Sequence, residues 1–110
     1  MPRDSKLYLD DILESINRIF TYVAGMDFDS FSEDQKTVDA VVRNLEIIGE
    51  AARALSVDVK NSMPDIQWNK IVALRNILTH EYFGINRQIV WDVVQTKLAA
   101  LKISCEKAIQ

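Results

Sequence analysis

Apolar residues recur along the chain at steps of three and four, which is the spacing of one face of an α-helix. The pattern is clear in residues 5–24. Asp4 or Ser5 can cap the start of such a helix, and Gly25 can end it in a left-handed turn. The apolar positions of this first predicted helix are Leu9, Ile12, Leu13, Ile16, Ile19, Phe20 and Val23.

A second helix is predicted over residues 33–56, with Ser32 and Gln35 forming a capping box at its start. It carries apolar residues on two sides, so we expect it to be central, or to pack both on its own fold and on a partner. One side consists of Val38, Val41, Val42, Leu45, Ile48, Ala52 and Leu55, and the other of Ala40, Ile47, Ala51 and Ala54.

The same spacing predicts a third helix over residues 66–83, opened by Pro64 and Asp65 and ended by Gly84, and a last helix over 87–109, capped by Asn86. Residues 26–32 are interpreted as a linker, and residues 57–64 as a connector with room for one helical turn. The predicted fold is therefore an all-α, up-and-down four-helix bundle in a single domain over residues 1–110. A short extra helix can lie between the second and third helices.

The composition fits one globular helical domain: 48% of residues are apolar, 26% are charged, and the chain of 110 residues has three glycines and two prolines. The single cysteine, Cys105, lies on an apolar helix face and is interpreted as a packing residue. It excludes an internal disulfide and is typical of a reducing compartment. The sequence shows no signal-peptide pattern and no apolar run of membrane-spanning length, so we expect a cytoplasmic protein without a membrane partner.

Residues 75–83 concentrate the side chains suited to chemistry. His80 is the only histidine, and an imidazole can accept or donate a proton near neutral pH. Arg75 carries a permanently charged guanidinium that binds phosphate oxygens in a fixed geometry. Together they suit cleavage of a phosphodiester in RNA without a metal, with the histidine moving the proton and the arginine stabilising charge on the phosphate.

Arg75 and His80 lie five positions apart, which is roughly 140° around a helix, so they do not share a face. Asn76 and His80, four apart, do. The result is a broad polar arc that makes a poor pocket alone and a better one when two copies meet across a two-fold axis. A symmetric dimer also supplies a second histidine, so we expect a homodimer.

Other interpretations of these residues stay open. His80 can be a hydrogen-bonded structural histidine, and Arg75 can be an ion-pair partner for Glu46 or Glu50. The net charge of −3 is not typical of a protein that binds nucleic acid over a broad surface, so RNA contact would have to be local. Asp10, Asp11 and Glu14 are interpreted as a solvated acidic face and not as metal ligands. No zinc-ligand spacing, glycine-rich phosphate loop or strand pattern for a dinucleotide fold occurs.

The spacing of Arg75, His80 and Tyr82 matches the R-x4-H-x-Y signature of the HEPN superfamily. The chain resembles the HepT-like branch of that superfamily. Further segments carry the same resemblance across most of the chain. They are Tyr8–Ile12, Arg43–Ala52, Trp68 with Ile71, Arg75-Asn76, His80–Phe83 and Val90-Trp91.

The resemblance implies a metal-independent endoribonuclease toxin that needs no cofactor. Arg75 and His80 would be the catalytic pair at a homodimer interface, with Asn76 orienting them, and tRNA or mRNA would be the substrate. Tyr82 would accept AMP from a cognate minimal nucleotidyltransferase antitoxin, as in a type VII-like toxin–antitoxin system. The alternative is a non-catalytic helical subunit that binds nucleotide or presents substrate to a nucleotidyltransferase, which the acidic net charge favours.

Overall fold

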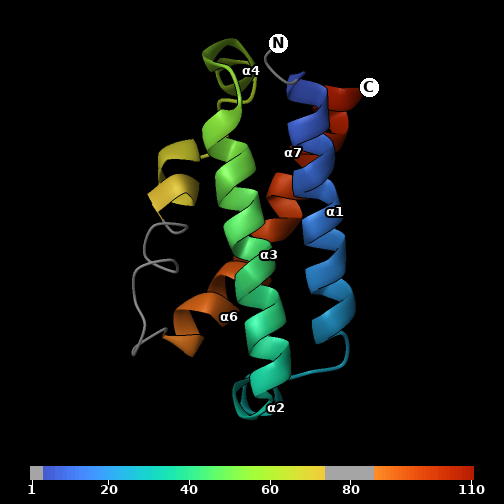
Figure 1. Ribbon diagram of the computed structural model, residues 1–110, viewed down its shortest axis with the longest axis vertical. Coiled ribbons are helices and arrows are strands. Elements are labelled where there is room, and N and C mark those ends of the chain that lie inside the picture. Colours follow the sequence, from blue (N-terminus) through green and yellow to red (C-terminus); the bar gives the residue numbers. More distant parts are fainter. Residues whose placement is uncertain (1–3, 74–85) are drawn as a thin grey trace.

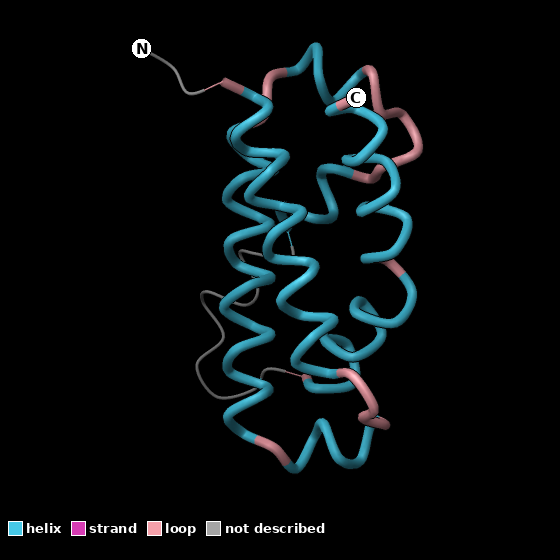
Figure 2. The backbone as a smooth tube through the Cα atoms, turned by 90° about the vertical axis from the view of Figure 1, so that its right-hand side faces the viewer, coloured by secondary structure: helices cyan, strands magenta, loops and turns pink. Residues whose placement is uncertain are grey.

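The computed structural model describes residues 4–73 and 86–110, and every regular element in these two ranges is a helix (Figure 1). The all-α prediction is confirmed. The helices run mostly along the long axis of the molecule, with loops at its two ends (Figure 2). The elements are α1 (Ser5–Val23), α2 (Phe28–Glu33), α3 (Gln35–Ala54), α4 (Val57–Asn61), α6 (Arg87–Thr96) and α7 (Leu98–Ile109), and residues 68–73 are also helical.

The first helix, α1, forms as the apolar spacing predicts. The Asp4 carboxylate accepts a hydrogen bond from the Lys6 backbone N–H at 2.9 Å and so caps its start. Gly25, with φ of 78°, takes the left-handed conformation just beyond its end. The predicted apolar face is the packed face: five of its seven members are buried and the other two, Leu13 and Phe20, are half-buried.

The segment interpreted as a linker is partly helical, and that prediction is wrong. Asp27 and Ser30 form a capping box that starts α2 at Phe28. The Asp27 carboxylate accepts from the Ser30 backbone N–H at 2.8 Å, and the Ser30 hydroxyl accepts from the Asp27 backbone N–H at 3.0 Å. Phe31, which is fully buried, gives the short helix an apolar anchor. Residues 28–33 therefore form one helical turn and a half packed on the core.

The predicted capping box of Ser32 and Gln35 is also wrong. The cap of α3 is Asp34, whose carboxylate accepts from the Thr37 backbone N–H at 3.1 Å, and the helix begins at Gln35. All seven residues of its main predicted apolar face are buried. α3 runs beside α1 in the opposite direction, and this pair makes the most extensive helix contact among the described elements (Figure 1).

The connector after α3 contains α4, which confirms the short extra helix between the second and third predicted helices. The Ser56 hydroxyl accepts from the Val59 backbone N–H at 3.2 Å and caps it. Met63 is buried, and the chain is helical again over residues 68–73. The remainder of the predicted third helix, residues 74–83, lies outside the described residues.

The predicted last helix, 87–109, is divided into α6 and α7 at Lys97. Val90, Val94, Leu98, Leu101 and Cys105 are buried, so one apolar face continues through the break. α7 packs on α1, and α6 packs on α2. At the second contact the centroids of the Trp91 and Phe31 rings lie 5.0 Å apart. The C-terminal helices thereby close the bundle against the first two.

Candidate functional site

The four predicted site residues, Arg75, Asn76, His80 and Tyr82, all lie outside the described residues, as does Gly84. The structure therefore neither brings them together nor separates them. It does describe the two places where the chain enters and leaves this segment, at Ala73 and at Asn86. These two places, and the described residues next to them, define the candidate site.

The exit from the segment is fixed by two polar residues. The Asn86 side-chain oxygen accepts hydrogen bonds from the Gln88 and Ile89 backbone N–H groups, at 3.0 and 3.2 Å, and so caps α6 as predicted. The guanidinium of Arg87 donates to the Ser32 carbonyl oxygen and to the Gln35 side-chain oxygen. Arg87 therefore ties the start of α6 to the junction of α2 and α3, a contact that no sequence motif indicates.

The entry to the segment is fixed mainly by apolar packing. Trp68, which is 8% exposed, and Met63, which is 6% exposed, belong to the core. Ile71 and Val72 are half-buried and pack against it. Helical residues 68–73 are therefore held on the core by their apolar side, while Lys70 and Ala73 stay exposed.

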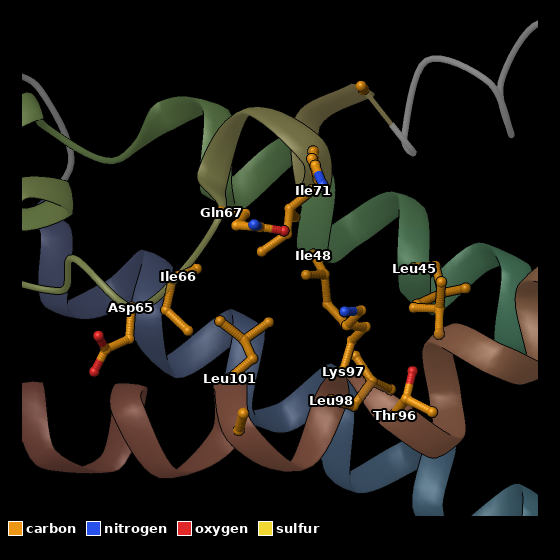
Figure 3. A pocket seen from close by; sticks show the side chains of 14 residues that line it. Leu45, Ile48, Asp65, Ile66, Gln67, Ile71, Thr96, Lys97, Leu98 and Leu101 are labelled. Atoms are coloured by element: carbon orange, nitrogen blue, oxygen red, sulfur yellow. The ribbon is translucent and has the colours of Figure 1, made fainter.

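An open cavity of about 600 Å³ lies beside this entry, between α3, residues 65–73 and the α6–α7 junction (Figure 3). Aliphatic side chains make most of its wall. Lys70, from helical residues 68–73, and Lys97, from the α6–α7 junction, also line it. Figure 3 shows the Lys97 side chain reaching from the helix junction into the space that Ile48 and Leu101 border. The lining residues are Leu45, Ile48, Asp65, Ile66, Gln67, Lys70, Ile71, Ala73, Val93, Thr96, Lys97, Leu98, Ala100 and Leu101. Sequence reasoning did not find this cavity.

Charge is distributed unevenly along the described parts of the chain. Residues 4–54 carry eleven acidic and five basic side chains, residues 57–73 carry two of each, and residues 86–110 carry four basic and two acidic ones. The net charge of −3 thus conceals a surplus of negative charge on α1–α3 and of positive charge on α6 and α7. A polyanion would be repelled by the first surface and attracted to the second.

Charged side chains form ion pairs on the surfaces of α3 and α1. On α3, Arg43 and Glu46, three residues apart, pair with an N–O distance of 3.5 Å. On α1, Lys6 pairs with Asp10 at 3.5 Å, and Arg18 pairs with Glu14. In residues 4–73 and 86–110, no three His, Cys, Asp or Glu side chains gather as a metal-binding group.

Cys105 is fully buried on α7, and burial raises the pKa of its thiol to about 12 because the thiolate loses its hydration. A thiol with that pKa is almost entirely protonated near neutral pH, so it cannot serve as a nucleophile. The interpretation of Cys105 as a packing residue is confirmed.

None of the helices in the described part of the chain is both long enough and apolar enough to cross a bilayer.

A model of the family described as Ribonuclease HepT-like matches residues 12–108, which include the candidate segment. The chain belongs to this family. The HepT-like resemblance and the assignment of the chain to a ribonuclease family are thereby confirmed.

Curated HepT-like relatives cover nearly all of the chain. A Methanocaldococcus jannaschii protein described as a candidate RNase is 44% identical over 99 residues, which are 89% of this chain and 82% of the relative. A second such protein from the same organism is 39% identical over 104 residues, covering 94% and 95%. A Thermococcus cleftensis protein described as a candidate ribonuclease HepT is 39% identical over 107 residues, 97% of each chain. No solved structure is significantly similar to this HepT-like chain.

Proposed function

We propose that this protein is a metal-independent endoribonuclease toxin of a type VII-like toxin–antitoxin system. Its active site would form at a homodimer interface from Arg75 and His80. The observation that carries the proposal is the family match over residues 12–108, within which the arginine and the histidine keep the spacing of the HEPN signature.

The chemistry follows from the residue types. His80 removes the proton from a ribose 2′-hydroxyl, the 2′-oxygen attacks the adjacent phosphorus, and the bond from phosphorus to the 5′-oxygen breaks. That oxygen takes a proton from the second histidine of the dimer, acting as the acid. Arg75 stabilises the negative charge that grows on the phosphate, and Asn76 orients the pair. Bonds and protons balance without a metal.

The uneven charge distribution supports this proposal against the objection raised by the acidic net charge. RNA does not need to lie over the whole protein. It needs one basic surface, and α6 and α7, which follow the segment that carries Arg75 in the chain, have a positive surplus, with Lys70 preceding that segment. The alternative, a non-catalytic subunit that binds nucleotide or presents substrate, predicts binding at this surface without cleavage.

The deciding experiment compares RNA cleavage by the purified wild-type protein and by His80→Ala, both in the presence of EDTA. We expect the variant to lose at least about 100-fold in rate, since general acid–base catalysis contributes about 10²–10⁴-fold. Light scattering should give a dimer for both. Equal cleavage by the two proteins would refute the catalytic assignment, and binding without cleavage by the wild type would favour the alternative.

Neutralisation would act through Tyr82. AMP on its phenol oxygen adds bulk and negative charge beside the catalytic arc, so it would exclude RNA and occupy the arginine. After incubation with ATP and the cognate nucleotidyltransferase, we expect mass spectrometry to show added AMP mass on the wild type and none on Tyr82→Phe. Addition of AMP to Tyr82→Phe would place the acceptor elsewhere.

A further inference from the structure

We propose that the cavity bordered by Lys70 and Lys97 holds one unpaired nucleotide of the RNA substrate. The base would lie against the aliphatic wall, and the phosphates on either side would lie at the two ammonium groups. This inference rests on the proposed ribonuclease function and adds a substrate-binding site to it, formed by described residues only.

The first argument is size and wall chemistry. A volume of about 600 Å³ is in the range of ligand sites, which are about 300–1,000 Å³. Ile48 from α3, Ile71 from the entry helix and Leu101 from α7 give aliphatic surface on three sides. A nucleobase has two apolar faces and a polar edge, so it can lie on aliphatic surface and keep its edge towards the open side. Gln67 and Thr96 stand on the lining with groups that can bond that edge.

The second argument is charge. Lys70 and Lys97 are exposed, and neither forms an ion pair within residues 4–73 and 86–110. An ammonium group is a good point contact for a phosphate oxygen. Because Lys70 and Lys97 line the cavity from two separate segments, they can contact two successive phosphates of one strand. Asp65 also lines the cavity, and Figure 3 shows its carboxylate at one end, turned away from Ile48 and Leu101.

The third argument is position along the chain. Ala73, which lines the cavity, is two residues before Arg75. A nucleotide in the cavity would therefore be held next to the start of the segment that carries the proposed catalytic pair. A base inside a duplex cannot enter such a cavity without being unpaired and unstacked, which costs a few kcal/mol. The site thus predicts a preference for single-stranded RNA, which sequence alone did not indicate.

The test fills the cavity without touching the core. Ala100 is exposed and lines the cavity, whereas Ala99 is exposed on the same helix and does not line it. Ala100→Trp and the matched control Ala99→Trp are compared in binding to a short fluorescent single-stranded RNA carrying 2′-O-methyl groups, which the proposed reaction cannot cleave. We expect Ala100→Trp to weaken binding about tenfold or more, in line with base contacts worth about 1–3 kcal/mol, and Ala99→Trp to bind as the wild type does.

The charge contribution is measured from the salt dependence of the same binding. The double variant Lys70→Gln/Lys97→Gln should reduce the slope of log K against log salt by roughly 1.4, since each phosphate contact of a single strand contributes about 0.7. The control Lys6→Gln/Lys36→Gln removes the same charge from the acidic surface and should leave the slope unchanged. An unlabelled duplex should compete more weakly than the matching single strand.

The outcomes separate this inference from the catalytic proposal. If Ala100→Trp binds RNA as tightly as the wild type does, while His80→Ala abolishes cleavage, the cavity site is refuted and the ribonuclease stands. A second outcome is that the wild type binds RNA without cleaving it and that Ala100→Trp does not bind it. The cavity site then stands and the catalytic pair is refuted. If Ala100→Trp alone converts a dimer to a monomer in light scattering, the cavity is covered by a second copy and the nucleotide site is refuted.

Discussion

The two sides of this bundle are built from the same kind of amphipathic helix but differ in how completely they are packed. α1 and α3 are long, lie antiparallel and bury their apolar faces, with Ile12, Ile16 and Ile19 fully inaccessible. Residues 57–73 with α6 and α7 form shorter pieces, interrupted at Lys97, and an open cavity separates part of them from Leu45 and Ile48 of α3. The first side is acidic and the second has the positive surplus. The difference suggests that α1 and α3 stabilise the fold, and that the opposite side is shaped for a ligand.

The largest effect is expected when the same truncation is made on each side. Ile16→Ala removes buried methyl groups from a closed core and should lower the free energy of unfolding by about 2–5 kcal/mol. Ile71→Ala, on the wall of a cavity that is already open, should cost less than about 1.5 kcal/mol. Urea unfolding of both variants measures the contrast. Equal losses of stability would mean that the cavity is closed in solution, and the contrast between a closed and an open side would then be wrong.

Removal of the contact that joins the two sides should have an intermediate effect. Arg87→Ala deletes the hydrogen bonds to the Ser32 carbonyl and the Gln35 side chain. We expect it to lower the free energy of unfolding by about 1–2 kcal/mol, since these two bonds are partly exposed to solvent. Arg18→Ala, which removes an exposed ion pair with Glu14, is the matched control and should cost at most about 0.5 kcal/mol. Thermal unfolding of the two variants is the measurement, and equal shifts would show that Arg87 contributes no more than a surface pair.

Cys105 tests whether α7 is firmly packed on α1 despite the break before it. Because burial raises the pKa of the thiol to about 12, protein at pH 8 should react with a slow thiol reagent only through the small equilibrium fraction of unfolded molecules. The rate should therefore rise in Ile16→Ala by the factor by which unfolding becomes more favourable. Rapid labelling of the folded wild type would contradict the packing of α7 on this side.

The smallest effect is electrostatic and lies at the start of α3. The hydrogen bonds from Thr37 lower the pKa of Asp34 below its ordinary value of 3.8, so this carboxylate contributes stability above pH 3.8 and loses it as the pH falls through the lowered pKa. Asn also caps helices well but does not titrate there. Asp34→Asn should therefore lose less stability than the wild type between pH 6 and pH 3. Asp29→Asn, which removes a carboxylate that caps no helix, is the control, and a change as large as that of Asp34→Asn would contradict the capping explanation.

The sequence predicted the well-packed side better than the open one. The spacing of apolar residues in α1 and α3 identified the buried faces because helical periodicity alone decides which side turns inward. The errors came where two local signals compete. Ser32 can cap a helix that begins at residue 33, and Asp34 can cap one that begins at residue 35. The structure uses Asp34, because Asp27 and Ser30 already fold residues 28–33 into α2.

The break at Lys97 and the cavity have no local signal. The apolar spacing of residues 90–105 continues through the break, so periodicity predicts one helix. A cavity depends on how far apart three separate segments stand, which no single segment encodes. The roles of Arg75, Asn76, His80 and Tyr82 stay predictions, because these residues lie outside the described part of the chain and the family match concerns the chain as a whole.

The placement of the two tryptophans has a practical consequence. Trp91 lies against Phe31 where α6 meets α2. Trp68 is buried at the start of helical residues 68–73, directly after Gln67, which lines the cavity. They are the only indole fluorophores of the chain. Trp91→Phe and Trp68→Phe would therefore each leave a single optical reporter. Trp68 emission would register events near the cavity, and Trp91 emission would register separation of the helices around Arg87.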